Sequence, residues 1–273
     1  MPDESTPPSP RSVPPVTPDA YALEREFHPP ALPGEVVVRA ELDDLHHTMG
    51  AELLIHAKNC VRAFGDFHLA LSGGSTPLPF YRMLMTDPAF RDLPWKFTHL
   101  WVVDERCVPF DDERSNWGQL AHYFARHADI PEKNLHPMPA TDPNGDVAYE
   151  RTLREHLMWR EKGQDRLDFV LLGMGADAHT ASLFPQSPAL RERERLIVFN
   201  DGEHVVPPPR MTMTYPLINA SRYIAVLATG EKKAQTLRTI ASDERPSVGE
   251  APILGIEPVG GVLKWFLDGE ACG

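Results

Sequence analysis

An acid and an imidazole stand two residues apart in this sequence, at Asp177 and His179. They follow the apolar run 168–172 and two glycines, Gly173 and Gly175, at which a backbone can turn tightly. Histidine titrates near neutral pH and a carboxylate beside it can orient its ring, so the pair predicts a general base. The alternative is a polar turn whose histidine only caps a helix. Spacing alone leaves both open, because the chain has 12 histidines.

A glycine-rich turn is the second stretch that could take part in binding or catalysis. Its residues are Ser72, Gly73, Gly74, Ser75 and Thr76. An apolar run precedes it and Pro77 follows, which predicts a strand, a turn and the start of a helix. Backbone N–H groups at such a helix start favour an anion. The turn is not a Walker loop, because no Gly-Lys-Ser/Thr follows, and it lacks the dinucleotide glycine pattern. The alternative is a tight turn that binds nothing.

Cationic side chains stand near the ends of other predicted elements. Asp104, Glu105 and Arg106 follow the apolar run 98–103, where charged residues are either a solvated loop or part of a site. Arg210 follows three prolines in a stiff loop, and Lys233 lies in a helix that is expected to begin at Glu231. With the glycine-rich turn, Arg210 and Lys233 predict a phosphate clamp, and Arg106 offers a bidentate fork.

These side chains need a scaffold that brings distant parts of the chain together. Apolar runs of strand length alternate with helical patterns, which predicts a doubly wound, mostly parallel α/β sheet with helices on both faces. Ligands bind at the carboxyl ends of the strands in such sheets, where all of these residues would meet. The expected strands are 35–40, 67–71, 98–103, 168–172, 196–199, 223–230 and 263–267, and the expected helices are about 41–64, 117–127, 147–162 and from 231 onward.

The first 33 residues differ from the rest in composition. They are rich in proline, mixed with Ser, Thr and Glu, and predict a mostly disordered tail that is either inert or a recruitment segment. Residues 34–273 are expected to form a single catalytic domain.

Composition excludes several classes of function. The net charge of -12 argues against a partner nucleic acid or an anionic membrane, although a few local cations can still hold a small anion. No apolar run approaches the ~20 residues of a membrane span, and the N-terminus lacks an apolar signal core. Three scattered cysteines fit a reducing compartment, so we expect a cytoplasmic protein. We also expect a monomer or a small homo-oligomer.

The range of possible reaction types is narrowed by two kinds of motif that the sequence lacks. No Gly-x-Ser-x-Gly elbow supplies a nucleophilic serine. No Cys/His ligand spacing suggests a metal. A base without a nucleophilic side chain indicates activation of water, or proton transfer on carbon.

Five motifs occur in order, and together they resemble the 6-phosphogluconolactonases of the glucosamine-6-phosphate isomerase/6-phosphogluconolactonase superfamily. They are Leu71–Pro77, Asp104–Pro109, Gly173–Pro185, Pro209–Thr212 and Thr229–Ala234, and the resemblance covers about residues 35–268. The deaminating relatives differ at two places: their acid motif reads Asp-Glu-Tyr, and their histidine is followed by Ile-Ala-Phe-Asn-Glu-Pro. Here Arg106 and the stretch 180–185 stand at these places, which favours the lactonases.

The resemblance implies a cofactor-free enzyme that hydrolyses the lactone ester of 6-phospho-D-glucono-1,5-lactone to 6-phospho-D-gluconate, the second step of the oxidative pentose phosphate pathway. His179 would deprotonate the attacking water, and Asp177 would orient its ring. Backbone N–H groups around Gly73–Gly74 or Gly173–Gly175 would hold the oxyanion. Arg210 and Lys233 would hold the 6-phosphate, with Arg106 as a second or alternative partner.

The sequence departs from the family pattern at Ala178, where a glycine normally precedes the histidine. If this position needs a positive φ, the alanine carries strain of about 1 kcal/mol. Ala176 also replaces a residue that is often acidic. Two other functions stay open: a sugar-phosphate isomerase or deaminase with Asp104 as its base, and a non-catalytic sugar-phosphate sensor.

Overall fold

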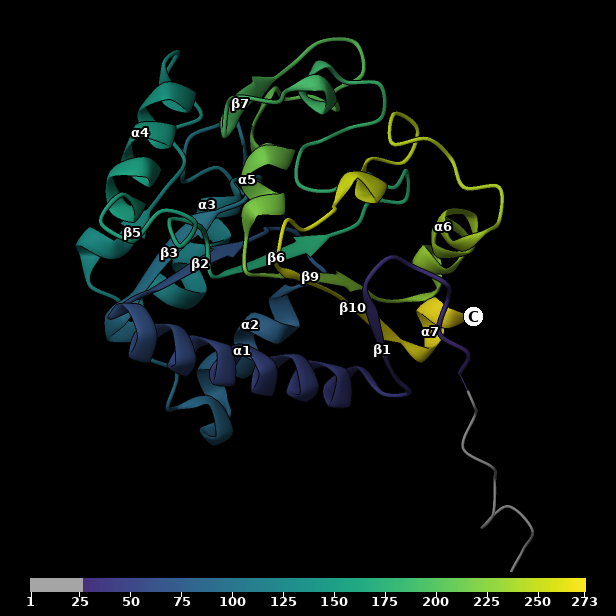
Figure 1. Cartoon of the computed structure of the whole chain (residues 1–273), viewed down its shortest axis with the longest axis horizontal. Coiled ribbons are helices and arrows are strands. Elements are labelled where there is room, and N and C mark those ends of the chain that lie inside the picture. The colour runs from purple at the N-terminus through teal and green to yellow at the C-terminus, as the bar shows by residue number, and fades with distance from the viewer. Residues whose placement is uncertain (1–26) are drawn as a thin grey trace, which may run out of the picture.

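A seven-stranded sheet forms the centre of the computed structural model, which describes residues 27–273 (Figure 1). The strand order is β1-β10-β9-β6-β2-β3-β5, and every neighbouring pair is parallel. The strands are β1 (Glu35–Arg39), β2 (Phe67–Leu71), β3 (Thr98–Val102), β5 (Leu135–His136), β6 (Phe169–Gly173), β9 (Tyr223–Ala228) and β10 (Val262–Asp268). The prediction of a mostly parallel sheet is confirmed.

Helices cover both faces of this sheet, as a doubly wound fold requires. In the view of Figure 1, α1 and α2 lie below the sheet and α4 and α5 lie above it. The helices are α1 (Leu42–Phe64), α2 (Leu78–Thr86), α3 (Asn116–Leu120), α4 (Gly145–Leu157), α5 (Tyr215–Ala220), α6 (Glu231–Ala241) and α7 (Gly269–Cys272). Within residues 27–273, none of them is both long enough and apolar enough to span a bilayer.

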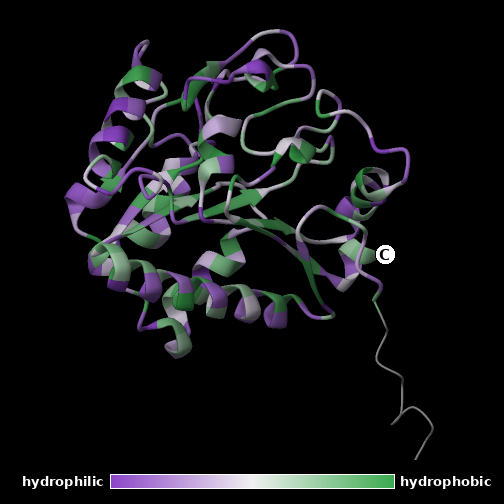
Figure 2. Ribbon diagram, in the orientation of Figure 1, coloured by the Kyte–Doolittle hydropathy of each residue, from purple (hydrophilic) through white to green (hydrophobic). Residues whose placement is uncertain are grey.

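The core lies where the apolar runs of the sequence are covered on both sides. Every residue of β2 and of β9 is buried, which is the environment of a central parallel strand. α1 contributes buried side chains at helical spacing, among them Leu45, Met49 and Leu53. Figure 2 shows the same division, with apolar strands at the centre and hydrophilic residues on the outer side of α1.

The strand order reverses direction between β2 and β6. From β2 the chain moves outward to β3 and β5, and it then returns to the other side of β2 with β6, before β9 and β10 extend the sheet that way. A ligand crevice forms at such a reversal, outside the carboxyl ends of the strands. The two loops that leave these strands carry the glycine-rich turn and His179.

A small antiparallel sheet above the main one was not predicted. It consists of β4 (Asp104–Arg106), β8 (Arg210–Met213) and β7 (Ile197–Asn200), in the order β4-β8-β7. The sequence analysis described Asp104–Arg106 and the stretch around Arg210 as loops. Both predictions were wrong, because charged residues hide the usual strand pattern and the pairing comes from tertiary contacts. The register sets Arg106 opposite Arg210.

The observed helix boundaries differ most from the expected ones where the apolar repeat in the sequence is short. The helix expected over 117–127 is α3 followed by a π-helical turn at Ala121–Ala125, and the helix expected over 147–162 ends at Leu157. α5 and α7 have six and four residues, too few to show a periodic pattern in the sequence.

The end of the proline-rich segment packs against the domain. Leu32 is buried, the indole nitrogen of Trp265 donates a hydrogen bond to the carbonyl of Pro33 (2.8 Å), and Arg245 donates to the carbonyl of Ala31 (2.7 Å). The predicted disorder therefore does not extend to residue 33. Residues 1–26 lie outside the described part, so the division into a tail and one domain stays a prediction.

Candidate active site

A cavity of about 320 Å³ opens at the carboxyl ends of the central strands, where the strand order reverses. Its walls come from the loops after β2, β3 and β6, from β8 and from α6. All the predicted site residues except Asp177 line it: Ser72, Gly73, Gly74, Ser75, Thr76, Asp104, Arg106, Gly173, Gly175, His179, Arg210 and Lys233. The fold thus brings together residues that are 161 positions apart in the chain, from Ser72 to Lys233.

His179 and Asp177 form a hydrogen-bonded pair at the edge of this cavity. Asp177 Oδ1 lies 2.5 Å from His179 Nδ1, so Nδ1 carries the proton and Nε2 keeps its lone pair. Burial raises the pKa of Asp177, but the hydrogen bond and the charge of His179 outweigh burial, so this pKa lies below its ordinary value. The His179 side chain is 32% exposed, which leaves it open to water and ligand. This geometry is that of an oriented general base.

The loop that carries this pair is closed by its own hydrogen bonds. The Gly175 N–H donates to the His179 carbonyl (2.8 Å), and the Thr180 hydroxyl donates to the Gly173 carbonyl (2.9 Å). A Cβ at position 175 would lie 2.1 Å from His179 Nδ1, so only glycine lets the imidazole rest against the backbone there. The sequence of the loop therefore fixes the ring before any ligand arrives.

Ala178 has a φ of 60°, in the left-handed region that favours glycine. It is buried, and its carbonyl accepts a hydrogen bond from Ile253 N–H (3.0 Å). The position thus needs a positive φ, as the sequence analysis considered, and the alanine there holds a strained backbone. The Asp177–His179 hydrogen bond is nevertheless formed, so the strain does not disassemble the pair.

We expect Ala178→Gly to change the free energy of unfolding by less than about 1 kcal/mol. Relief of the left-handed backbone returns about 1–2 kcal/mol, whereas loss of the buried methyl costs about 0.8 kcal/mol and the freer unfolded chain about 0.4–1 kcal/mol. Ala178→Val meets the same φ with a β-branched side chain and should lose more than about 2 kcal/mol. Urea denaturation of the three proteins measures both values. Equal stability of the valine variant would contradict a strained position.

The glycine-rich turn packs against α3. The Ser72 hydroxyl donates to the Leu171 carbonyl (2.9 Å), which ties β2 to β6. A Cβ on Gly73 would lie 2.0 Å from Asn116 Oδ1, so this glycine permits the contact between the turn and the start of α3. The Gly74 N–H donates to Gln119 Oε1 (3.0 Å). The N–H groups of Gly74 and Gly175 already have partners inside the protein, which removes two of the expected oxyanion donors.

Asn116 is a cavity residue that the sequence analysis did not single out. Its amide donates to the Asp104 carbonyl (2.7 Å) and to Asp104 Oδ1 (3.3 Å), and its Oδ1 accepts from Arg106 (2.6 Å). The other Asp104 oxygen accepts from the Ser182 hydroxyl (2.5 Å). Both oxygens of Asp104 are thus occupied, and Asn116 links this carboxylate to the Arg106 guanidinium.

Three cations line the cavity without a carboxylate partner. Within residues 27–273, none of Arg106, Arg210 and Lys233 forms an ion pair, although ion pairs are formed elsewhere. Among the described residues, Arg210 donates hydrogen bonds only to backbone carbonyls, those of Val206 (3.3 Å) and Pro208 (3.1 Å). Burial lowers the pKa of Arg210 and of Lys233 below their ordinary values. A cavity lined by three cations that form no ion pair is suited to an anion such as phosphate.

The Phe184 ring lies close to both His179 and one of these cations. Its ring centroid is 4.7 Å from that of His179 and 5.6 Å from the Arg210 guanidinium carbon. Other lining residues that the sequence did not indicate are Pro77, Met174, Ala181 and Val206. Apolar side chains of this kind carry no chemical signal in a sequence, so they were found only through the fold.

Glu105 shapes the loop and does not line the cavity. Its buried carboxylate accepts from the N–H groups of Arg106 (2.7 Å), Asn116 (2.8 Å) and Trp117 (2.7 Å), and from the Ser115 hydroxyl (3.0 Å). Burial raises its pKa, opposed by these hydrogen bonds. This carboxylate therefore holds Arg106 and Asn116 in place.

Glu105→Gln should cost about 1–3 kcal/mol of stability, because the new amide group faces a buried N–H that then lacks an acceptor. The displaced loop should also weaken ligand binding through Arg106. Urea denaturation and a ligand titration measure the two effects. Glu113→Gln is the matched control, since Glu113 is exposed on the same loop. A Glu105→Gln variant as stable as this control would contradict the bracing role.

A sequence profile described as glucosamine-6-phosphate isomerases/6-phosphogluconolactonase matches residues 40–265 of this chain. The chain belongs to this family. The family resemblance drawn from five motifs is therefore confirmed by a match over most of the chain.

Individual members of the family show how far the similarity extends. A 6-phosphogluconolactonase of Synechocystis sp. is 39% identical over 212 residues, which cover 76% of this chain and 84% of that protein. The GDH/6PGL endoplasmic bifunctional protein of Homo sapiens is 39% identical over 243 residues, or 86% of this chain, but the chain spans only 30% of its length. The crystal structure of 6-phosphogluconolactonase from Thermotoga maritima has a TM-score of 0.71 at 26% identity and covers 86% of this chain and 100% of its own.

Proposed function

We propose that this protein is a 6-phosphogluconolactonase that hydrolyses 6-phospho-D-glucono-1,5-lactone to 6-phospho-D-gluconate in the oxidative branch of the pentose phosphate pathway. One observation carries the proposal: the oriented base His179 shares a cavity with Arg106, Arg210 and Lys233, which have no carboxylate partner within residues 27–273. A base and a phosphate-binding set in one cavity suit a phosphorylated substrate that is attacked by water.

In the proposed reaction, His179 Nε2 removes a proton from a water molecule as the oxygen of that water attacks the lactone carbonyl. Asp177 stabilises the resulting imidazolium through the Nδ1–H hydrogen bond. When the tetrahedral intermediate collapses, the bond from C1 to the ring oxygen breaks, and His179 returns its proton to that oxygen. Water is consumed, one ester bond is cleaved, and the residues end as they began.

The oxyanion of the tetrahedral intermediate needs a hydrogen-bond donor that stabilises its negative charge. Gly74 and Gly175 use their N–H groups inside the protein. We assign this role to the Gly73 N–H, which has no hydrogen-bond partner among residues 27–273 and belongs to a residue in the cavity wall.

The 6-phosphate is held in this scheme by Arg210 and Lys233, with Arg106 as a further partner. Lys233 is on α6, whose Thr236 hydroxyl donates to the Ala176 carbonyl (2.8 Å) in the loop of the base. This contact keeps the phosphate site and the base at a fixed separation, as a rate-enhancing geometry requires.

The two alternatives are less well supported. A sugar-phosphate isomerase or deaminase would use Asp104 as a base toward carbon, but both oxygens of Asp104 already accept hydrogen bonds from Ser182 and Asn116. A non-catalytic sensor would follow if the strain at Ala178 disabled the base, but the Asp177–His179 pair is formed.

The substrate class, the cofactor requirement, the partners and the cellular location belong to the same proposal. The substrate is a small sugar phosphate lactone, and the reaction uses no cofactor and no metal. We further propose a cytoplasmic monomer or small homo-oligomer without nucleic-acid or membrane partners, in keeping with the net charge of -12.

The deciding experiment measures hydrolysis of freshly generated 6-phosphogluconolactone, coupled to 6-phosphogluconate dehydrogenase and corrected for spontaneous hydrolysis. Rapid turnover supports the proposal. Ammonia release from glucosamine-6-phosphate in its place would show a deaminase. Phosphosugar binding without turnover of either substrate would show a sensor.

A further inference from the structure

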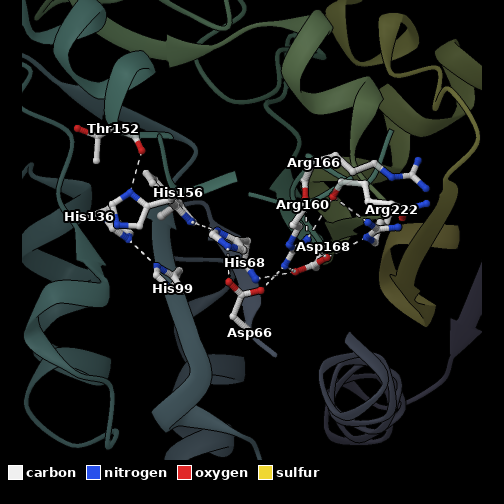
Figure 3. A network of polar contacts seen from close by, with 12 residues as sticks. Asp66, His68, His99, His136, Thr152, His156, Arg160, Arg166, Asp168 and Arg222 are labelled. Atoms are coloured by element: carbon white, nitrogen blue, oxygen red, sulfur yellow. Dashed lines mark hydrogen bonds and ion pairs between the residues drawn. The ribbon is translucent and has the colours of Figure 1, made fainter. Parts of the chain in front are cut away.

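Three histidines meet at the end of the sheet that is formed by β3 and β5, and none of them lines the cavity. His99 is near the amino end of β3, His136 ends the short strand β5, and His156 is in the last turn of α4 (Figure 3). One ring nitrogen from each of the three lies within 4.8 Å of the others. These residues come from elements far apart in the sequence, and the proposed reaction uses none of them.

The hydrogen bonds of His156 leave one nitrogen available. Its Nδ1 lies 2.8 Å from the Thr152 carbonyl, which can only accept, so Nδ1 carries the proton. The lone pair is therefore on Nε2. A histidine that donates one N–H to a backbone carbonyl and presents the other nitrogen is the usual arrangement of a metal ligand.

His99 and His136 direct ring nitrogens at each other. His99 Nδ1 and His136 Nε2 are 3.1 Å apart, so the two rings share a single proton between two lone pairs. Their planes are nearly parallel, with centroids 5.3 Å apart. A divalent cation that replaces this proton and is bound by both nitrogens, with Zn–N bonds of about 2.0–2.1 Å, would move the two rings slightly apart.

The neighbouring side chains position the ligand rings and are not ligands themselves. The Trp101 ring stacks on His136 with centroids 3.7 Å apart, and its indole N–H donates to His68 Nδ1 (3.1 Å). The other nitrogen of His68 must then donate to Asp66 (3.2 Å), which also accepts from Arg160 (2.5 Å). Figure 3 shows the contacts of Asp66 with His68 and with Arg160 beside the histidine cluster. Both nitrogens of His68 are therefore occupied.

We propose that His99, His136 and His156 form a binding site for a borderline divalent transition metal, with Zn²⁺ as the expected ion. Imidazole nitrogen is a preferred ligand of Zn²⁺, and three protein ligands plus one water complete a tetrahedron. His136 is nearly inaccessible, whereas His99 and His156 are partly exposed and give the ion a path of entry. The bound metal would join α4 to β3 and to the two-residue edge strand β5.

The test uses the full chain without a polyhistidine tag, freed of metal by dialysis against a chelator. Co²⁺ and Zn²⁺ are titrated separately into the wild type, His156→Gln, His28→Gln and His179→Ala. The readouts are calorimetric stoichiometry, the visible absorption of tetrahedral Co²⁺ and the shift in Tm with Zn²⁺. His28 is an exposed histidine outside the cluster and serves as the matched control.

We expect one tightly bound ion per wild-type chain, a tetrahedral Co²⁺ spectrum, and binding that is at least about tenfold weaker in His156→Gln. His28→Gln and His179→Ala should keep the wild-type affinity. The inference is overturned if the wild type binds no stoichiometric ion or if His156→Gln binds as tightly. It is also overturned if only His179→Ala loses binding, since the ion would then lie in the reaction cavity. Circular dichroism verifies that His156→Gln is folded.

Discussion

His179→Ala should lower kcat for 6-phosphogluconolactone by about 10²–10⁴-fold, the usual contribution of a general base. The alanine leaves the attacking water without a proton acceptor and the ring oxygen without a donor. Binding of 6-phosphogluconate should change little, because the proposed phosphate ligands Arg210 and Lys233 belong to β8 and α6, and the substitution removes neither of them. Stopped-flow turnover, corrected for spontaneous hydrolysis, measures kcat, and calorimetry measures the affinity for the product.

Two further variants make this result specific. His28→Ala removes an exposed histidine that does not line the cavity and should keep full turnover. Asp177→Asn should slow turnover less than His179→Ala, because the base remains but the group that fixes its tautomer is weakened. Full turnover by His179→Ala would show that another group activates the water.

Lys233→Ala should raise KM for the phosphorylated lactone by about 10–150-fold, which corresponds to the loss of one charged hydrogen bond of about 1.5–3 kcal/mol. The effect should be confined to the phosphate. Turnover of unphosphorylated glucono-1,5-lactone should therefore be the same in the variant and in the wild type. Initial rates over a range of each lactone measure both quantities.

The neighbouring residue supplies the control for this prediction. Lys232 is exposed on the same helix, so Lys232→Ala makes an equal change in net charge outside the cavity and should leave KM unchanged. If Lys233→Ala impairs both lactones equally, then Lys233 does not bind the phosphate. If the two lysine variants behave alike, long-range attraction and not contact explains the effect.

Local patterns in the sequence were sufficient for the main elements of the fold. The β2 strand matches the expected range 67–71, and the ends of α1 differ by one residue at most. These elements have either a continuous apolar run between turn residues or a long helical repeat, so each carries its own signal. The alternation of such elements also specified a parallel sheet and therefore the edge at which the loops meet.

Residue types and spacing along the chain were also enough to nominate His179 with Asp177 and the cations Arg210 and Lys233 for the candidate site, and their roles stay a prediction. The Asp177–His179 pair follows β6 and Lys233 follows β9, and the carboxyl ends of parallel strands share an edge whatever the details of packing, whereas Arg210 begins β8 of the small sheet. The positive φ that was suspected at Ala178 is present for a similar reason, since a tight turn restricts its own backbone.

Only the tertiary structure decided the rest. The charged strand β4 exists because β8 pairs with it, and Glu105 has its bracing role because a distant loop donates to it from Asn116 and Trp117. The cluster of His99, His136 and His156 shows the same limit, since its members have no ligand spacing along the chain and meet only where β3, β5 and α4 pack. A contact between distant segments depends on how complete elements pack, and residue types along one segment do not record that packing.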